Sequence, residues 1–208
     1  MEKNSKNIND LAIEYMEQKY AEKFEYSKPY GNSMAGTREF FITCASLQNQ
    51  QILVQIENCF KDNKIFRDNY SAVKYKNECI EFLQKCAADI FGNATIFYEV
   101  ANNGLSSELP ANATFNEFLA DTRVPLIVMI EVSESSFTNE EQVSKVGELI
   151  AVNGTDFILS VVVVEDDKYG SFNHETLNNQ ISLNLFVKCV QLTKIDDNVQ
   201  IDWLREEW

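Results

Sequence analysis

The segment Phe157–Val164 constrains the fold of this chain more than any other part of the sequence. Its eight residues include four consecutive valines and one polar residue, Ser160. β-Branched residues favour extended backbone, and a strand without polar alternation needs cover on both faces. We therefore expect a central strand here. The side chains expected in the core are Phe157, Leu159, Val161, Val162, Val163 and Val164.

Hydrophobic periodicity predicts further helices and strands around this segment. Apolar residues recur at three- and four-residue spacing in three stretches, which predicts helices over 9–24, 75–91 and 138–151, with a shorter one over 114–120. Strands are predicted over 38–45, 51–58, 94–100, 126–132, 183–193 and 199–204. The short loop 46–50 indicates an antiparallel hairpin, and the order strand–helix–strand over 126–164 indicates a parallel crossover. Thr138 and Glu141 have the spacing of a capping box, and residues 60–69 are expected to be irregular.

This element order predicts an α+β fold with the N-terminal helix first. We expect a mixed, largely antiparallel sheet with about three main helices packed on it. The 208 residues suffice for a single domain over 1–208 with its own core. A polar connection rich in turn residues, 102–113, is the candidate lobe boundary.

Cysteine usage and hydropathy bear on the compartment. Five cysteines form an odd set with no CxxC pair, which predicts free thiols rather than a disulfide framework or a zinc site. Cys79 and Cys86 lie seven residues apart and are expected on the buried face of one helix. The polar start and the short apolar runs predict a cytoplasmic protein without membrane contact. An upstream signal segment would make it extracytoplasmic instead.

The acidity of the chain is concentrated in its C-terminal part. The net charge is −14, and residues 92–208 carry 19 acidic and 6 basic side chains. This balance argues against a nucleic-acid partner. It leaves two interpretations, a solubilising surface or an acidic face that binds a basic protein partner. The second interpretation predicts that these side chains cluster: Glu140, Glu141, Glu148, Glu165, Asp166, Asp167, Asp196 and Asp197.

Familiar catalytic and cofactor motifs are not matched. The stretch Gly31–Arg38 resembles a phosphate-binding loop, but Thr37 stands where that loop needs lysine. His174 is the single histidine, and no nucleophile motif surrounds it, so we interpret it as a surface or helix-cap residue. No catalytic residue, cofactor or metal is therefore predicted.

Three further places are candidates for a pocket or an interaction surface. Arg67, Asp68 and Tyr70 follow one another closely; Arg67 and Asp68 either form a structural ion pair, or Arg67 and Tyr70 line a pocket for a carboxylate or a partner loop. The run Glu165–Asp167 is either a solvated turn or a site for a hard cation. Trp208, the last residue, either docks on the protein or belongs to an interaction patch.

The segment Tyr-Met-Glu-Gln-Lys-Tyr-Ala-Glu-Lys-Phe at residues 15–24 resembles the opening helix of small Gram-positive bacterial proteins of unassigned function. In that group such a helix leads into a small α+β domain. The resemblance covers ten residues, includes no catalytic residue, and implies a bacterial origin and an uncharacterised family.

Together these observations favour a protein of unknown function that acts as a non-enzymatic cytoplasmic interaction module. An immunity-type antagonist of a basic toxin is one version of this hypothesis. The alternative is an enzyme or small-ligand-binding protein whose site is assembled only in the fold. A deep pocket joining Arg67, His174 or Glu165 favours the alternative, whereas a contiguous acidic surface favours the module. No feature of the sequence predicts the oligomeric state.

Overall fold

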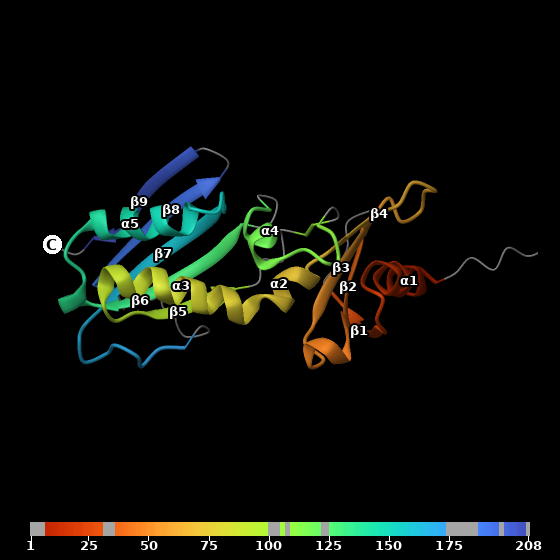
Figure 1. The fold of residues 1–208 in the computed structure, drawn as a ribbon, viewed down its shortest axis with the longest axis horizontal. Helices are drawn as coiled ribbons and strands as arrows, with labels where there is room; N and C mark the ends of the chain where they lie inside the picture. The colour runs from red at the N-terminus through yellow and green to blue at the C-terminus, as the bar shows by residue number, and fades with distance from the viewer. Residues whose placement is uncertain are drawn as a thin grey trace, which may run out of the picture. The chain divides into compact units, whose positions relative to one another are not determined.

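A computed structural model describes residues 7–30, 36–99, 105–106, 109–121, 125–173, 187–195 and 198–206, without the side chains of 99 and 203–206. The chain forms two compact units (Figure 1). Unit 1 contains Met1–Tyr75 and Ala101–Thr114, and unit 2 contains Lys76–Val100 and Phe115–Trp208. The expectation of one domain over 1–208 with a lobe boundary at 102–113 stays a prediction.

The predicted α+β class is confirmed. The described ranges contain five α-helices and two sheets with mostly antiparallel pairing, and the helix α1 comes first. The strands are divided between two sheets, whereas the sequence predicted one. None of the helices in the described ranges is long and apolar enough to cross a membrane.

Unit 1 consists of a four-stranded antiparallel sheet with α1 against it. Its elements are α1 (Ile8–Tyr20), β1 (Glu25–Pro29), β2 (Arg38–Thr43), the 3-10 turn η1 (Ala45–Leu47), β3 (Ile52–Glu57), β4 (Ile65–Asp68) and α2 (Tyr70–Lys74), with strand order β1-β2-β3-β4. The predicted β2–β3 hairpin is confirmed, with Phe40 opposite Val54. Buried Ala12 and Met16 of α1 contribute to the core.

Two strands of unit 1 correct the sequence interpretation. Residues 60–69 were expected to be irregular, but β4 pairs there with β3, and Asp68 lies opposite Val54. β1 lies in a segment for which no strand was predicted, and all five of its residues are exposed. Neither strand has alternating apolar residues, which explains why periodicity missed them.

Unit 2 contains the five-stranded sheet and the longer helices. Its elements are α3 (Lys76–Phe91), β5 (Thr95–Glu99), α4 (Phe115–Leu119), β6 (Leu126–Ser133), the 3-10 turn η2 (Glu134–Ser136), α5 (Glu140–Ala151), β7 (Phe157–Val164), β8 (Lys188–Ile195) and β9 (Asn198–Glu206). The strand order is β5-β6-β7-β8-β9, and only the β6–β7 pair of these described strands is parallel. The predicted parallel crossover and the central position of β7 are confirmed.

The two faces of β7 are covered by different groups. Phe157 lies beside α5, and the residues that alternate with it, such as Leu159 and Val161, are fully buried on the same face. On the other face Val162 and Val164 form a core cluster with Cys189, against which Tyr169 and Phe172, among others, pack. The predicted burial of β7 is therefore confirmed, and so is the burial of Cys79 and Cys86.

The start of α5 differs from the predicted capping box. The side chain of Asn139, rather than Thr138, accepts a hydrogen bond from the amide of Glu141, at 3.0 Å. The amide and hydroxyl of Thr138 instead donate to Oε1 of Gln142, at 2.6 and 2.9 Å. Asparagine is among the residues that cap best, so the cap is displaced by one position.

Candidate functional site

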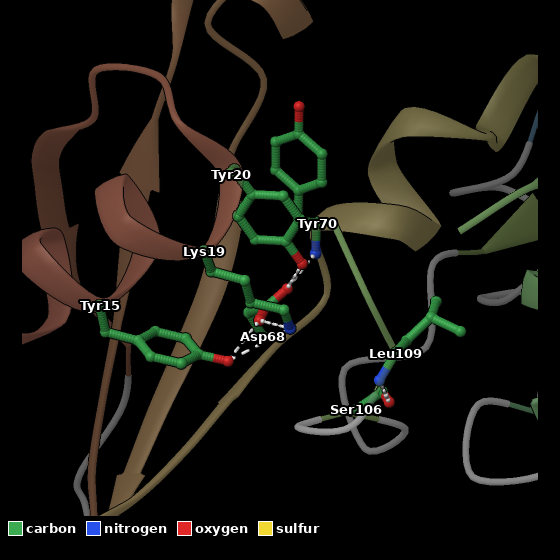
Figure 2. A network of polar contacts seen from close by, with 7 residues as sticks. All are labelled: Tyr15, Lys19, Tyr20, Asp68, Tyr70, Ser106 and Leu109. Carbon is green, nitrogen blue, oxygen red and sulfur yellow. Dashed lines mark hydrogen bonds and ion pairs between the residues drawn. The ribbon is translucent and has the colours of Figure 1, made fainter. Parts of the chain in front are cut away.

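Asp68 is the centre of a buried polar cluster in unit 1 (Figure 2). It is the last residue of β4, and its side chain is 2% exposed. Oδ2 accepts from the hydroxyl of Tyr15 at 3.1 Å and from Nζ of Lys19 at 2.8 Å. Oδ1 accepts from the hydroxyl of Tyr20 at 2.7 Å and from the amide of Tyr70 at 3.1 Å. Three of these donors come from α1, so the cluster joins that helix to the sheet.

Aromatic rings enclose the cluster. Tyr15 stacks on Phe66, with ring centroids 4.8 Å apart, and Tyr20 stacks on Tyr70 at 3.9 Å. The ammonium of Lys19 lies 5.6 Å and 5.1 Å from the ring centroids of Tyr15 and Tyr20. The positive charge is thus held between a carboxylate and two ring faces, which compensates for its removal from water.

Burial makes the tyrosines of this cluster poor acids. Desolvation is the first cause that raises the pKa of Tyr15 and Tyr20, and the negative charge of Asp68 raises it further. Burial, together with a hydrogen bond to Glu22, raises the pKa of Tyr70 to about 12. Neutral phenols remain donors, so Asp68 keeps its hydrogen bonds across the physiological pH range.

The geometry of the Asp68 cluster is that of a structural clamp. A carboxylate offers about four acceptor positions, and Asp68 uses four of them within the protein. The hydroxyl of Tyr70 donates to Oε1 of Glu22 at 2.5 Å. The structure therefore brings the predicted site residues Asp68 and Tyr70 together, but their polar atoms form hydrogen bonds within the protein that stabilise the fold.

Arg67 does not join this cluster. Its Nε lies 2.9 Å from Oε1 of Glu57, and both side chains are about one third exposed. Neighbouring residues of a strand point to opposite faces, so Arg67 and Asp68 take different partners. The interpretation of an Arg67–Asp68 ion pair is wrong, because the ammonium that pairs with Asp68 is that of Lys19.

The predicted acidic run Glu165–Asp167 lies at the carboxyl-terminal edge of β6 and β7. Because these strands are parallel, the run comes close to η2, and Oδ1 of Asp166 accepts from the amide of Ser135 at 3.0 Å. This hydrogen bond lowers the pKa of Asp166. All three acidic side chains are exposed, and Lys168 pairs with Glu165. Within the described ranges no three acidic, cysteine or histidine side chains are arranged to hold a metal ion.

Glu131 near the end of β6 is a buried carboxyl that sequence reasoning missed. It is fully buried, and its Oε1 accepts from the amide of Gly170 at 2.9 Å. Oε2 has no hydrogen-bond partner among the described residues. Burial raises the pKa of this carboxyl. An acid inside the apolar run 126–133 was the signal that could have identified it.

Several predicted residues lie outside the described residues. His174, Trp208, Asp196 and Asp197 belong to this group.

A groove of about 360 Å³ lies in unit 2 between α5 and the β8–β9 hairpin. Gly147 and Glu148 line it from α5, Leu192 from β8, and Val199 and Ile201 from β9. Together with Phe157 of β7, residues of four elements form this lining, which explains why no local sequence pattern indicated the groove.

No family model matches this chain, and no curated protein matches it. Among solved structures, the chain is similar to the crystal structure of a DUF5037 family protein from Ruminococcus gnavus ATCC 29149, with 12% identity and a TM-score of 0.45. The match covers 95% of this chain and 96% of the other. A likeness at this level carries no argument about the function of this chain.

Proposed function

We propose that the chain is a non-enzymatic binding module, and that unit 2 binds a basic protein partner. The observation that carries this proposal is the set of exposed carboxylates at one edge of the unit 2 sheet. The parallel pairing of β6 and β7 brings η2 and the turn after β7 to this edge, and α5 begins just after η2. The exposed acidic residues of this edge, called the acidic edge, are Glu134, Glu140, Glu141, Glu165, Asp166 and Asp167, of which Glu141 and Glu165 pair with Lys145 and Lys168.

A group of like charges attracts an oppositely charged partner over distances of several ångströms. It raises the association rate, and salt weakens the effect because the Debye length is about 8 Å at physiological ionic strength.

Glu148 lies two turns further along α5, away from the acidic edge. The acidic residues predicted to cluster therefore do not all belong to one surface.

The Asp68 cluster argues against a catalytic role for Asp68 in unit 1. Its carboxylate accepts four hydrogen bonds from the protein itself, and its tyrosines keep their protons. A general base needs an acceptor that faces substrate. The cluster thus favours a structural role and leaves recognition to other surfaces.

The cytoplasmic location and the bacterial source belong to the same proposal. The five free, buried thiols support the cytoplasmic location. The resemblance of the opening helix supports the bacterial source. An immunity-type antagonist that covers a basic toxin is one form that such a module takes.

The test measures how association depends on charge. The full chain is immobilised, basic proteins are captured from a lysate of the source organism, and the association rate of each purified candidate is measured at low and high salt. The test variant combines Glu134→Gln, Glu165→Gln and Asp167→Asn at the acidic edge. The matched control removes three exposed charges from unit 1 through Asp10→Asn, Glu25→Gln and Asp62→Asn.

We expect the acidic-edge variant to associate about tenfold more slowly at low salt, with the control close to the unmodified chain. An association rate that is the same at both salt concentrations contradicts the proposal. Equal slowing by both variants also contradicts it, because net charge rather than the acidic edge would then determine the rate.

A further inference from the structure

Strand β9 forms an exposed edge of the unit 2 sheet (Figure 1). It pairs with β8, and no other strand in the described part of the chain pairs with it. Every residue from Asn198 to Asp202 is exposed, and Val199 and Ile201 are 64% and 39% exposed. An edge strand presents backbone N–H and C=O groups that another extended chain can pair with.

The groove beside β9 is shaped by small residues of α5. Ser144, Gly147 and Ala151 line its helix side. A Cβ at Gly147 would collide with Leu192 of β8, so the missing side chain allows the helix to lie close to the sheet. The apolar side chains of Val199 and Ile201 line the opposite side. The volume of about 360 Å³ is sufficient for more than one aliphatic side chain.

The charges around the groove favour a basic occupant. Lys194 lies in the lining, but its Nζ is 3.0 Å from Oδ1 of Asp156, whose side chain is 1% exposed. The other charged residue of the lining, Glu148, is exposed, and so is Asp202 on the opposite face of β9. A second copy of this chain would bring the same negative charges to the contact, with a net charge of −14 on each copy.

From these observations we infer that β9 and the groove bind an extended segment of the basic partner. The segment pairs with β9 through its backbone, inserts aliphatic side chains into the groove, and places the Lys or Arg side chains that alternate with them on the opposite face, against Asp202. This inference rests on the proposed function, because it names the docking site for the same class of partner.

The test uses the full chain and defined peptides. The probe is a 12-residue peptide that alternates Ile and Lys. One comparison peptide alternates Ile and Glu, and a second has the composition of the probe with its Ile residues at helical spacing. We expect the alternating Ile–Lys peptide to bind at least tenfold more tightly than either comparison peptide. Hydrogen–deuterium exchange should show that it protects the amides of Asn198–Asp202.

Variants separate the groove from the rest of the surface. Val199→Lys and Ile201→Lys should each weaken binding of the probe peptide at least tenfold. Val152→Lys is the matched control, because Val152 is 76% exposed at the end of α5 and does not line the groove. Ser144→Leu, which fills the groove from the helix side, should also weaken binding. It provides a second variant should a substitution in β9 prevent folding.

Three outcomes overturn the inference. These are equal binding of the acidic peptide, equal weakening by Val152→Lys, and binding without protection of the β9 amides. Failure of the inference is distinct from failure of the proposed function. If a basic protein associates through the acidic edge and is indifferent to Val199→Lys, the docking site is wrong and the binding module remains.

Discussion

The hydroxyl of Tyr20 donates to Oδ1 of Asp68 over 2.7 Å, although 48 positions separate the two residues. This contact attaches the last turn of α1 to the end of β4. Lys19 and Tyr15 of the same helix bind the other carboxylate oxygen. One aspartate therefore holds three side chains of the first helix at the end of β4.

Asp68→Asn should strongly destabilise unit 1. The substitution removes the negative charge and leaves the ammonium of Lys19, whose side chain is 14% exposed, without its ion-pair partner. Removal of one member of a buried pair costs about 3–5 kcal/mol. Urea denaturation followed by circular dichroism measures this loss. Arg67→Ala is the control, since its partly exposed pair with Glu57 contributes less than about 1 kcal/mol. A denaturation midpoint unchanged by Asp68→Asn contradicts the clamp.

Alkaline pH should destabilise the protein through the tyrosines around Asp68. The pKa of Tyr20 is raised in the folded chain above its ordinary value of 10, so the folded state holds this proton more tightly than the unfolded state does. The stabilising contribution is complete below pH 10 and decreases as the pH rises above that value. The free energy of unfolding, measured from pH 8 to pH 12, should fall less steeply for Tyr20→Phe. Tyr26→Phe on the exposed strand β1 is the control, and equal slopes for all three proteins count against the explanation.

Glu131→Gln should stabilise unit 2 at neutral pH. Burial raises the pKa of Glu131, so the folded state disfavours its charged form, and stability declines as the pH rises through this raised pKa. Glutamine keeps the shape of the side chain and its bond to the amide of Gly170 without the charge. A gain in the free energy of unfolding is expected at pH 7, because the folded state no longer buries a charge. The gain should vanish below the ordinary pKa of 4.5. Thermal unfolding at pH 4 and pH 7 tests both statements, and an equal or lower melting temperature at pH 7 contradicts them.

The thiols should be unreactive in the folded protein. All five cysteines are buried, and burial raises the pKa of Cys79 to about 12 and that of Cys189 to about 11. Because the thiolate is the reactive form, a disulfide reagent at pH 8 should react slowly with the native chain. In denaturant without reductant, five thiols should titrate. Fewer than five would indicate a disulfide, which the roughly 10 Å spacing of Cys79 and Cys86 along α3 does not allow between these two.

Local periodicity was sufficient to predict the elements that bury an apolar face. β7, α3 and the β2–β3 hairpin all have one, and all three are confirmed. β1 has only exposed residues, and β4 is four residues long within a polar segment, so neither has a pattern that could be recognised. Their pairing depends on β2 and β3, which supply the hydrogen-bonding edges.

The candidate sites were less predictable because their members meet only in three dimensions. Asp68 and Tyr70 were selected as candidates, but the donors from α1 lie about 50 residues earlier, and no spacing rule links them. Of the two interpretations of Arg67, the ion pair with Asp68 is wrong because neighbours in a strand point to opposite faces, and Arg67 pairs with Glu57 instead. The groove beside β9 depends on Gly147 and Val199, which belong to elements far apart in the chain.

The division of unit 1 into two stretches of chain has a consequence for its synthesis. The segment Ala101–Thr114 belongs to this unit, where Ser106 pairs with Asp68 and the carbonyl of Ala113 accepts from the hydroxyl of Tyr75 at 2.5 Å. Domains usually fold in N-terminal to C-terminal order as they leave the ribosome. Here the N-terminal unit lacks part of its structure until Thr114 has emerged, by which time α3 and β5 of unit 2 have already been made. A nascent chain stalled after Tyr75 should therefore stay sensitive to protease, and one stalled far enough beyond Thr114 to clear the exit tunnel should acquire resistance in its first 75 residues.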